Sequence, residues 1–204
     1  TEFYLPEKYR SMTRSESENI QQIYAALDPR IKTVDAVSLL RQHTDEYLYF
    51  RTDHHWTGLA AYYAFTRFAE AAGFEPQPLE AFTARRLENF LGSLYSQTQD
   101  SSLAENPDYV EYYLLPNQYE AWRYLPDAPF TPFATTLHGE YAQGVNSYSV
   151  FLHGDFPLIQ VKTDQNHGRK ILVVKESYGN AFAPFLATYY DEVHIVDQRY
   201  FQLN

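Results

Sequence analysis

Two short segments, far apart in the chain, carry the side chains that nucleophilic catalysis requires. Residues 51–57 contain Asp53 and His55 at a spacing of two, and residues 175–180 contain Ser177. In an extended segment, residues i and i+2 face the same way, so Asp53 can accept a hydrogen bond from Nδ1 of His55. Nε2 of His55 is then free to take a proton from a serine hydroxyl. These are the parts of a Ser-His-Asp triad, which is defined by geometry and not by chain order.

Ser177 follows a near-continuous apolar run and precedes a helical pattern. Ligand sites in open α/β sheets lie outside the carboxyl ends of the strands. The amides of Ser177, Tyr178 or Gly179 can therefore donate to an oxyanion at the start of that helix. The alternative is that Ser177 only caps the helix, which is the commoner role of a serine at such a junction. The surrounding residues do not form the Gly-x-Ser-x-Gly motif.

Two further features allow alternative interpretations. Gly154 follows an apolar run and can offer its N–H to an oxyanion, or it can belong to an ordinary Gly-Asp turn. Asp53, His54 and His55 can be a metal site, or a capping aspartate beside two core histidines. Adjacent histidine side chains diverge and no other cluster completes a ligand set, so we expect no metal and no cofactor.

Composition limits the class of protein. The 204 residues carry a net charge of −10, which argues against nucleic acid as a partner because such proteins have clustered Lys and Arg. No apolar run approaches the ~18 residues of a transmembrane helix. The absence of cysteine excludes disulfides and thiolate chemistry, and it favours an extracytoplasmic location. We expect a single domain over residues 1–204.

The apolar periodicity predicts helices and strands in alternation. We expect one helix to begin after the cap Thr57 and to end at Gly73. A Pro- and Tyr-rich region, about residues 75–147, predicts a loop-rich insertion with one or two β-hairpins. The other expected helices are 15–27 and 180–190, and the expected strands are 31–37, 47–50, 148–152, 158–161, 170–175 and 193–196.

Three blocks together resemble a known family. Thr-Asp-His-His-Trp at 52–56 resembles the signature that names the bacterial DHHW proteins, and residues 175–182 resemble their serine block. Asp-Gln-Arg-Tyr at 197–200 resembles their later Asp-x-Arg-Tyr element. The family is similar to the SGNH-like domains of alginate O-acetyltransferases, in which the Asp-x-His pair also precedes the serine.

The resemblance implies an architecture. We expect an SGNH-hydrolase-like α/β fold of three layers, with a mainly parallel sheet and the loop-rich, β-containing insertion described above. The chain ends at Asn204, soon after the Asp-x-Arg-Tyr element, so we expect a final strand or helix of the domain beyond it. Since the chain opens at Thr1 and not at Met, we also expect a removed leader or an N-terminal anchor.

The resemblance also implies roles for the site residues. Asp53 orients the imidazole, His55 is the general base and Ser177 is the nucleophile, while His54 and Trp56 hold their segment in place. Lys175 and Glu176 stand where the usual SGNH block has Gly-Asp. The candidates for oxyanion or substrate contacts are Tyr178, Gly179, Asn180, Gly154 and Arg199.

The function implied is serine-dependent acyl transfer, by an O-acetyltransferase or O-acetylesterase acting on an exported or cell-surface polysaccharide. The expected partners are the polysaccharide and a membrane protein that exports acetyl groups. A non-catalytic polysaccharide-binding or assembly module on the same fold is the alternative. We expect a ring-stacking surface for sugars from the insertion, at Tyr109, Tyr112, Tyr113 and Trp122.

Overall fold

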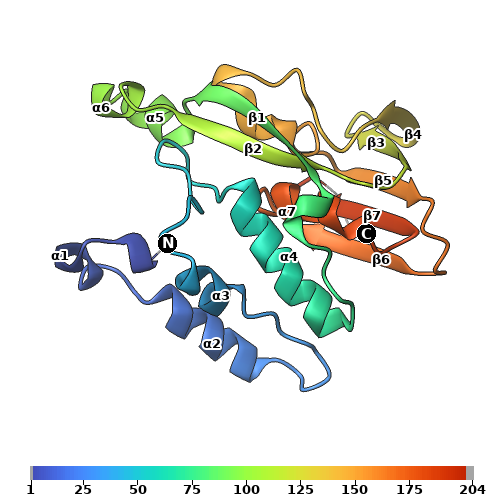
Figure 1. The fold of residues 1–204 in the computed structure, drawn as a ribbon, viewed down its shortest axis with the longest axis horizontal. Coiled ribbons are helices and arrows are strands. Elements are labelled where there is room, and N and C mark those ends of the chain that lie inside the picture. The colour runs from blue at the N-terminus through green and yellow to red at the C-terminus, as the bar shows by residue number, and fades with distance from the viewer. Residues whose placement is uncertain (1, 201–204) are drawn as a thin grey trace.

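A five-stranded sheet forms one side of the computed structural model, which describes residues 2–200 (Figure 1). Its strands lie in the order β4-β3-β5-β7-β6. Alternating apolar side chains such as Ile159 and Val161 of β5 bury one face of the sheet. The strands are β3 (Tyr119–Leu125), β4 (Ala128–Thr135), β5 (Leu158–Thr163), β6 (Lys170–Lys175) and β7 (Glu192–Asp197).

The strand directions correct the expected topology. Only β6 and β7 pair in parallel, while the pairs β3–β4, β3–β5 and β5–β7 are antiparallel. The expectation of a mainly parallel sheet is therefore wrong. Residues 164–169 are the whole link between β5 and β6, and a crossover between parallel strands needs a dozen residues or more. β5 consequently runs opposite to its successor.

Helix α4 (Gly58–Ala72) confirms the helix predicted after Thr57. The Thr57 hydroxyl accepts a hydrogen bond from the Ala60 amide, and Gly73 ends the helix with φ of 87°, a left-handed conformation that suits glycine. α4 packs against α7 (Gly179–Leu186), which ends four residues before the predicted boundary. Their contact includes Phe65 stacked on Phe185, with 5.3 Å between ring centroids.

The remaining helices are short. Near the N-terminus, α3 packs against α4, α2 lies beside α3, and α1 lies at the left edge of the view, all away from the main sheet (Figure 1). No helix among residues 2–200 is long and apolar enough to cross a membrane. The elements are η1 (Glu2–Tyr4), α1 (Glu7–Arg10), α2 (Glu16–Ala26), α3 (Ala36–Gln42), η2 (Leu79–Ala81), α5 (Ser93–Thr98), α6 (Ser101–Ala104) and η3 (Gly144–Val150).

The region expected as an insertion contains two antiparallel strand pairs, in agreement with the predicted hairpins. One is β1 (Thr83–Phe90) with β2 (Asp108–Leu114), and the other is β3 with β4. Because β3 lies inside the main sheet, the region also builds the core. Tyr112 and Tyr113 are buried there, so the expectation that they form a sugar-stacking surface is wrong.

Three predicted strands are absent from the described residues. Residues 47–50 form only an isolated bridge between Tyr49 and Trp56, residues 31–35 form no strand, and η3 occupies most of 148–152. Leu48 and Phe50 are nevertheless buried. The apolar run at 47–50 therefore predicted burial correctly, whereas Ile31 is exposed, and such short runs do not fix the backbone period.

A buried ion pair joins the carboxyl ends of the two parallel strands. Nζ of Lys175 lies 2.8 Å from Oδ2 of Asp197, and both side chains are almost fully buried. Arg199 donates to the same carboxylate, and Asp155 contacts both cations. Burial alone raises the pKa of Asp197, but the hydrogen bonds from Arg199 and Lys175 outweigh it and hold this pKa well below its usual range.

Asp197→Asn should destabilise the fold because it leaves the Lys175 charge without its main partner. We expect a loss of about 2–3 kcal/mol at pH 7, less than for a fully orphaned buried charge because Asp155 remains. The pKa of Asp197 is lower in the folded protein than in the unfolded chain, so its carboxylate stabilises the fold at pH values above the unfolded pKa of about 3.9. This stabilisation is lost as the pH falls toward the folded pKa. The gap to the wild type should therefore be constant from pH 5 to 8 and shrink below about pH 4.

Urea denaturation across this pH range measures the effect, with the exposed Asp127→Asn as the matched control. The control should unfold with the wild type at every pH. An Asp197→Asn midpoint equal to that of the control at pH 7 would contradict the assignment of the ion pair as stabilising.

Candidate active site

Asp53, His55 and Ser177 form a continuous chain of hydrogen bonds. Nδ1 of His55 lies 2.6 Å from Oδ1 of Asp53, and Nε2 lies 2.9 Å from Oγ of Ser177. These distances are those of a nucleophile–base pair with an orienting carboxylate. With an ionised Asp53, the imidazole carries its proton on Nδ1, and Nε2 is left to accept the serine proton.

The Asp53 carboxylate is buried but well supplied with donors. Oδ1 also accepts from the His55 amide at 2.9 Å, and Oδ2 accepts from the Ser93 amide at 2.7 Å. Burial by itself raises the pKa of Asp53, but the hydrogen bonds from His55 and Ser93 hold this pKa well below its usual range. Asp53 is therefore a stable anion that faces Nδ1 of His55.

Gly92 is what lets the Ser93 amide reach Asp53. A Cβ atom at position 92 would overlap the Asp53 carboxyl group, so a glycine is required for this close approach. From the sequence alone, Gly92 and Ser93 after the apolar pair 90–91 could be either an oxyanion donor or an ordinary turn, and nothing linked them to Asp53.

Asp108, at the start of β2, fixes the loop that carries Asp53, and sequence reasoning did not select it. Its carboxylate accepts from the amides of Arg51 and Thr52 at 3.0 and 2.7 Å, from the Thr52 hydroxyl at 2.7 Å, and from the Tyr47 hydroxyl. The Thr52 hydroxyl in turn accepts from the Gly92 amide at 3.0 Å. The available signal was an aspartate beginning an aromatic strand, since Asp is depleted in strands.

Tyr148, in η3, supports the imidazole from one side. Its ring stacks on His55, with centroids 3.8 Å apart and planes 10° apart, and its hydroxyl donates to the Ser177 carbonyl at 3.0 Å. Burial raises the pKa of Tyr148 well above its ordinary value, so the hydroxyl keeps its proton. Tyr148 thus ties the base to the serine segment, a contact the sequence did not predict.

His54 and Trp56 make the contacts of a brace between the two segments. Nδ1 of His54 lies 2.6 Å from the Ser93 hydroxyl. The Trp56 indole donates to the Tyr178 carbonyl at 2.9 Å, and the Tyr178 hydroxyl donates to the His54 carbonyl. That they hold the segment for catalysis remains a prediction.

Ser177 is not the cap of α7. The N-cap is Tyr178, without a side-chain capping bond, and the Ser177 hydroxyl is engaged with His55. The geometry therefore does not support the alternative that the Ser177 hydroxyl caps the helix.

Most of the donors proposed for an oxyanion are already used. The Gly179 amide donates to the Glu176 carbonyl at 3.0 Å, and the Gly154 amide donates to the Phe151 carbonyl at 3.1 Å. The Asn180 side-chain amide donates to Asp155 at 2.9 Å, and Arg199 is paired with Asp155 and Asp197. The Tyr178 amide differs, because its acceptor is the Glu176 carboxylate, at 3.1 Å.

The metal alternative has three ligand atoms, from Asp53, His54 and His55, within 4.8 Å of one another. Both ring nitrogens of His55 are engaged, with Asp53 and with Ser177. A metal ion would have to replace one of these hydrogen bonds. The hydrogen-bonded chain uses both ring nitrogens of His55. Three clustered ligands, by contrast, are an incomplete ligand set for a tetrahedral metal ion.

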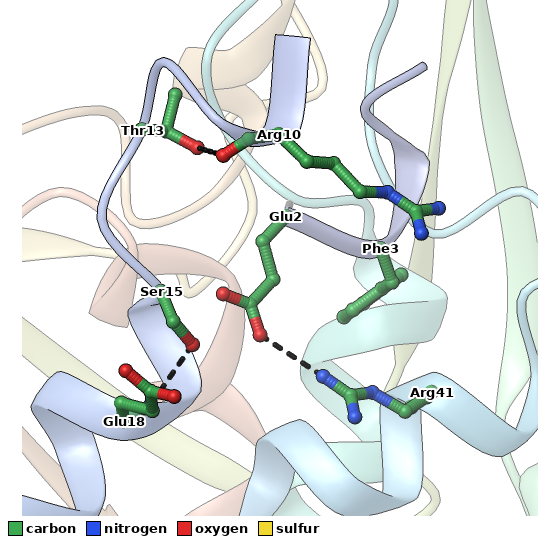
Figure 2. A pocket seen from close by; sticks show the side chains of 7 residues that line it. All are labelled: Glu2, Phe3, Arg10, Thr13, Ser15, Glu18 and Arg41. Atoms are coloured by element: carbon green, nitrogen blue, oxygen red, sulfur yellow. Dashed lines mark hydrogen bonds and ion pairs between the residues drawn. The ribbon is translucent and has the colours of Figure 1, made fainter. Parts of the chain in front are cut away.

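Two hollows flank this part of the fold. One, of about 400 Å³, is lined by Trp56, Glu176, Tyr178 and Phe182 among others. The largest, about 580 Å³, lies between the N-terminal helices, where an ion pair of 2.9 Å joins Glu2 and Arg41 across it (Figure 2). It shares no lining residue with the site. Neither hollow is lined by Asp53, His55 or Ser177 themselves, but the first is lined by the two sequence neighbours of Ser177.

Comparisons with known proteins show the family and the fold of the chain. A family model described as DHHW protein matches residues 8–196. The crystal structure of a DHHW family protein from Eubacterium siraeum has a TM-score of 0.88 and 35% sequence identity, over 98% of this chain and 67% of that one. No curated protein matches.

Two structures of Bacillus cereus PatB1 share the fold at lower identity. One carries a sulfonyl adduct and has a TM-score of 0.76 with 19% identity, over 99% of this chain and 70% of that one. The other has a TM-score of 0.79 with 21% identity, over 99% and 71%. The family match, together with the Eubacterium structure, shows that the chain belongs to the DHHW protein family.

Proposed function

We propose that this protein transfers acyl groups through an ester on Ser177, adding acetyl to, or removing it from, hydroxyls of an exported or cell-surface polysaccharide. The observation that carries the proposal is the hydrogen-bonded chain from Asp53 through His55 to Ser177, with distances of 2.6 and 2.9 Å. The protein would then act outside the cytoplasm.

The mechanism follows from this chain. As Oγ of Ser177 attacks the carbonyl carbon of the acyl donor, Nε2 of His55 takes its proton, and the Asp53 carboxylate stabilises the imidazolium. When the tetrahedral intermediate collapses, His55 returns the proton to the leaving group. A sugar hydroxyl or water then attacks the acyl-serine and gives its proton to His55, and Ser177 recovers that proton as it leaves.

Two kinds of observation support the acetyl group and the polysaccharide: the family resemblance and the aromatic lining of a hollow near the serine segment. The SGNH-like domains of alginate O-acetyltransferases, which the family resembles, imply acetyl and a polysaccharide. The sulfonyl adduct of PatB1 comes from a kind of reagent that modifies activated nucleophiles. Trp56, Tyr178 and Phe182 line this hollow, and such rings pack against the apolar faces of sugars. A membrane protein that exports acetyl groups is the proposed partner.

Replacing Ser177 by Ala should abolish turnover of an acetyl ester. We expect p-nitrophenol release from p-nitrophenyl acetate to fall by about 10³-fold or more, as for other members of such triads. Ser11→Ala, at the exposed end of α1, is the matched control and should keep the wild-type rate. Equal rates for Ser177→Ala and the wild type would remove Ser177 from the mechanism. A zero rate for both, with retained polysaccharide binding in a pull-down, would favour the non-catalytic module.

Replacing Asp53 by Asn tests the orienting carboxylate. The amide cannot stabilise an imidazolium and favours the wrong imidazole tautomer, so kcat should fall by about 10³- to 10⁴-fold. Asp100→Asn, which changes an exposed helix cap, should leave kcat unchanged. A kcat for Asp53→Asn within threefold of wild type, with the fold intact by circular dichroism, would show that Asp53 has no part in the chemistry.

A chelator separates the triad from the metal alternative. Dialysis against EDTA should leave the esterase rate unchanged, because no step of the mechanism uses an ion. A loss of activity after dialysis that is reversed by Zn²⁺ would instead assign Asp53, His54 and His55 to a metal centre. Metal analysis of the dialysed protein checks that removal is complete.

A further inference from the structure

A carboxylate lies against the nucleophile in the free protein. Oε2 of Glu176 accepts the Tyr178 amide at 3.1 Å and lies 3.4 Å from Oγ of Ser177. On its other side, the same Oγ meets Nε2 of His55 at 2.9 Å. One side-chain oxygen of Glu176 is therefore close both to the attacking atom and to a backbone donor.

This carboxylate lies beside the place where an oxyanion would form, between the nucleophile and a backbone donor. The oxyanion of a tetrahedral intermediate stays next to the serine Oγ and lies about 2.7–3.1 Å from its donors. The neighbouring amides of Gly179 and Asn180 are committed to backbone carbonyls. The Tyr178 amide, by contrast, is held by the side chain of an exposed residue, which can turn into solvent without disturbing the backbone.

We propose that Glu176 occludes the site in the resting protein, with its carboxylate in the place of the oxyanion, and that an acyl donor binds productively only when Glu176 swings out. The inference rests on the proposed function of Ser177. While the carboxylate is in place, it also offers the serine proton a second acceptor besides His55, and its negative charge disfavours an oxyanion nearby.

A purely structural role for Glu176 makes a different prediction. A carboxylate near the start of a helix stabilises it by about 0.3–1 kcal/mol, so removing Glu176 would lower stability slightly and would lower the rate or leave it unchanged. Occlusion predicts the opposite for the rate. The apparent affinity for substrate is lowered when only a fraction of the protein has Glu176 swung out, so removing the Glu176 side chain should raise this affinity.

The test compares Glu176→Ala and Glu176→Gln with the wild type. For Glu176→Ala, we expect the second-order rate of inactivation by phenylmethylsulfonyl fluoride, and kcat/KM for p-nitrophenyl acetate, to rise roughly 3- to 30-fold, mainly through KM. Gln keeps an acceptor oxygen without the charge and should lie between Ala and Glu. Glu80→Ala, which removes an exposed glutamate in η2, should match the wild type.

A second readout does not depend on turnover. The amide proton of Tyr178, followed by NMR, should shift upfield in Glu176→Ala because it loses a charged acceptor, and should not move in Glu80→Ala. An unmoved Tyr178 amide, or rates in Glu176→Ala equal to or below those of a reactive wild type, would overturn the occlusion. Inertness of the wild type and of every Glu176 variant toward both reagents would instead overturn the proposed function of Ser177, and the inference with it.

Discussion

The Asp108 carboxylate is the contact on which the site depends. Five donors from Tyr47, Arg51 and Thr52 converge on this buried group, and they fix the loop immediately before Asp53. A buried carboxylate is tolerated only when its hydrogen bonds are satisfied, so the loop has little freedom to leave it. The Asp53–His55 pair inherits this rigidity, which preorganised catalysis needs because small displacements of a base cost much of the rate.

The serine is positioned independently, by the only parallel strand pair among the described strands. β6 and β7 end side by side with Lys175 opposite Asp197, and their ion pair fixes the backbone two residues before Ser177. Asp155 extends the same network to Asn180 in α7. Tyr148 then joins the halves, since its ring stacks on His55 and its hydroxyl holds the Ser177 carbonyl. The hydrogen bond between His55 and Ser177 is thus one of several contacts that join the two segments, with those of Trp56 and Tyr178 beside it.

Sequence reasoning reached the parts of the site that follow local rules. The spacing of Asp53 and His55, the strand-to-helix junction at Ser177 and the capped helix from Thr57 to Gly73 each follow from a short-range periodicity or a cap. The direction of β5 could not be predicted in this way, because apolar runs carry no information on strand polarity. Asp108, Gly92 and Tyr148 were also missed, since each acts across a long stretch of chain and its role exists only once the fold brings the segments together.

Occlusion by Glu176 would connect this architecture to the choice between sugar and water. A serine already hydrogen-bonded to His55 is ready to react, so an open site would allow water to hydrolyse any acyl-serine that forms. A carboxylate that returns to the Tyr178 amide when no substrate fills the hollow disfavours the oxyanion on the hydrolytic path as well as on the acylating one. A bound sugar that keeps Glu176 displaced removes this unfavourable effect on the oxyanion only for transfer of the acyl group to that sugar. Because Glu176 directly precedes Ser177, this selectivity needs no separate lid.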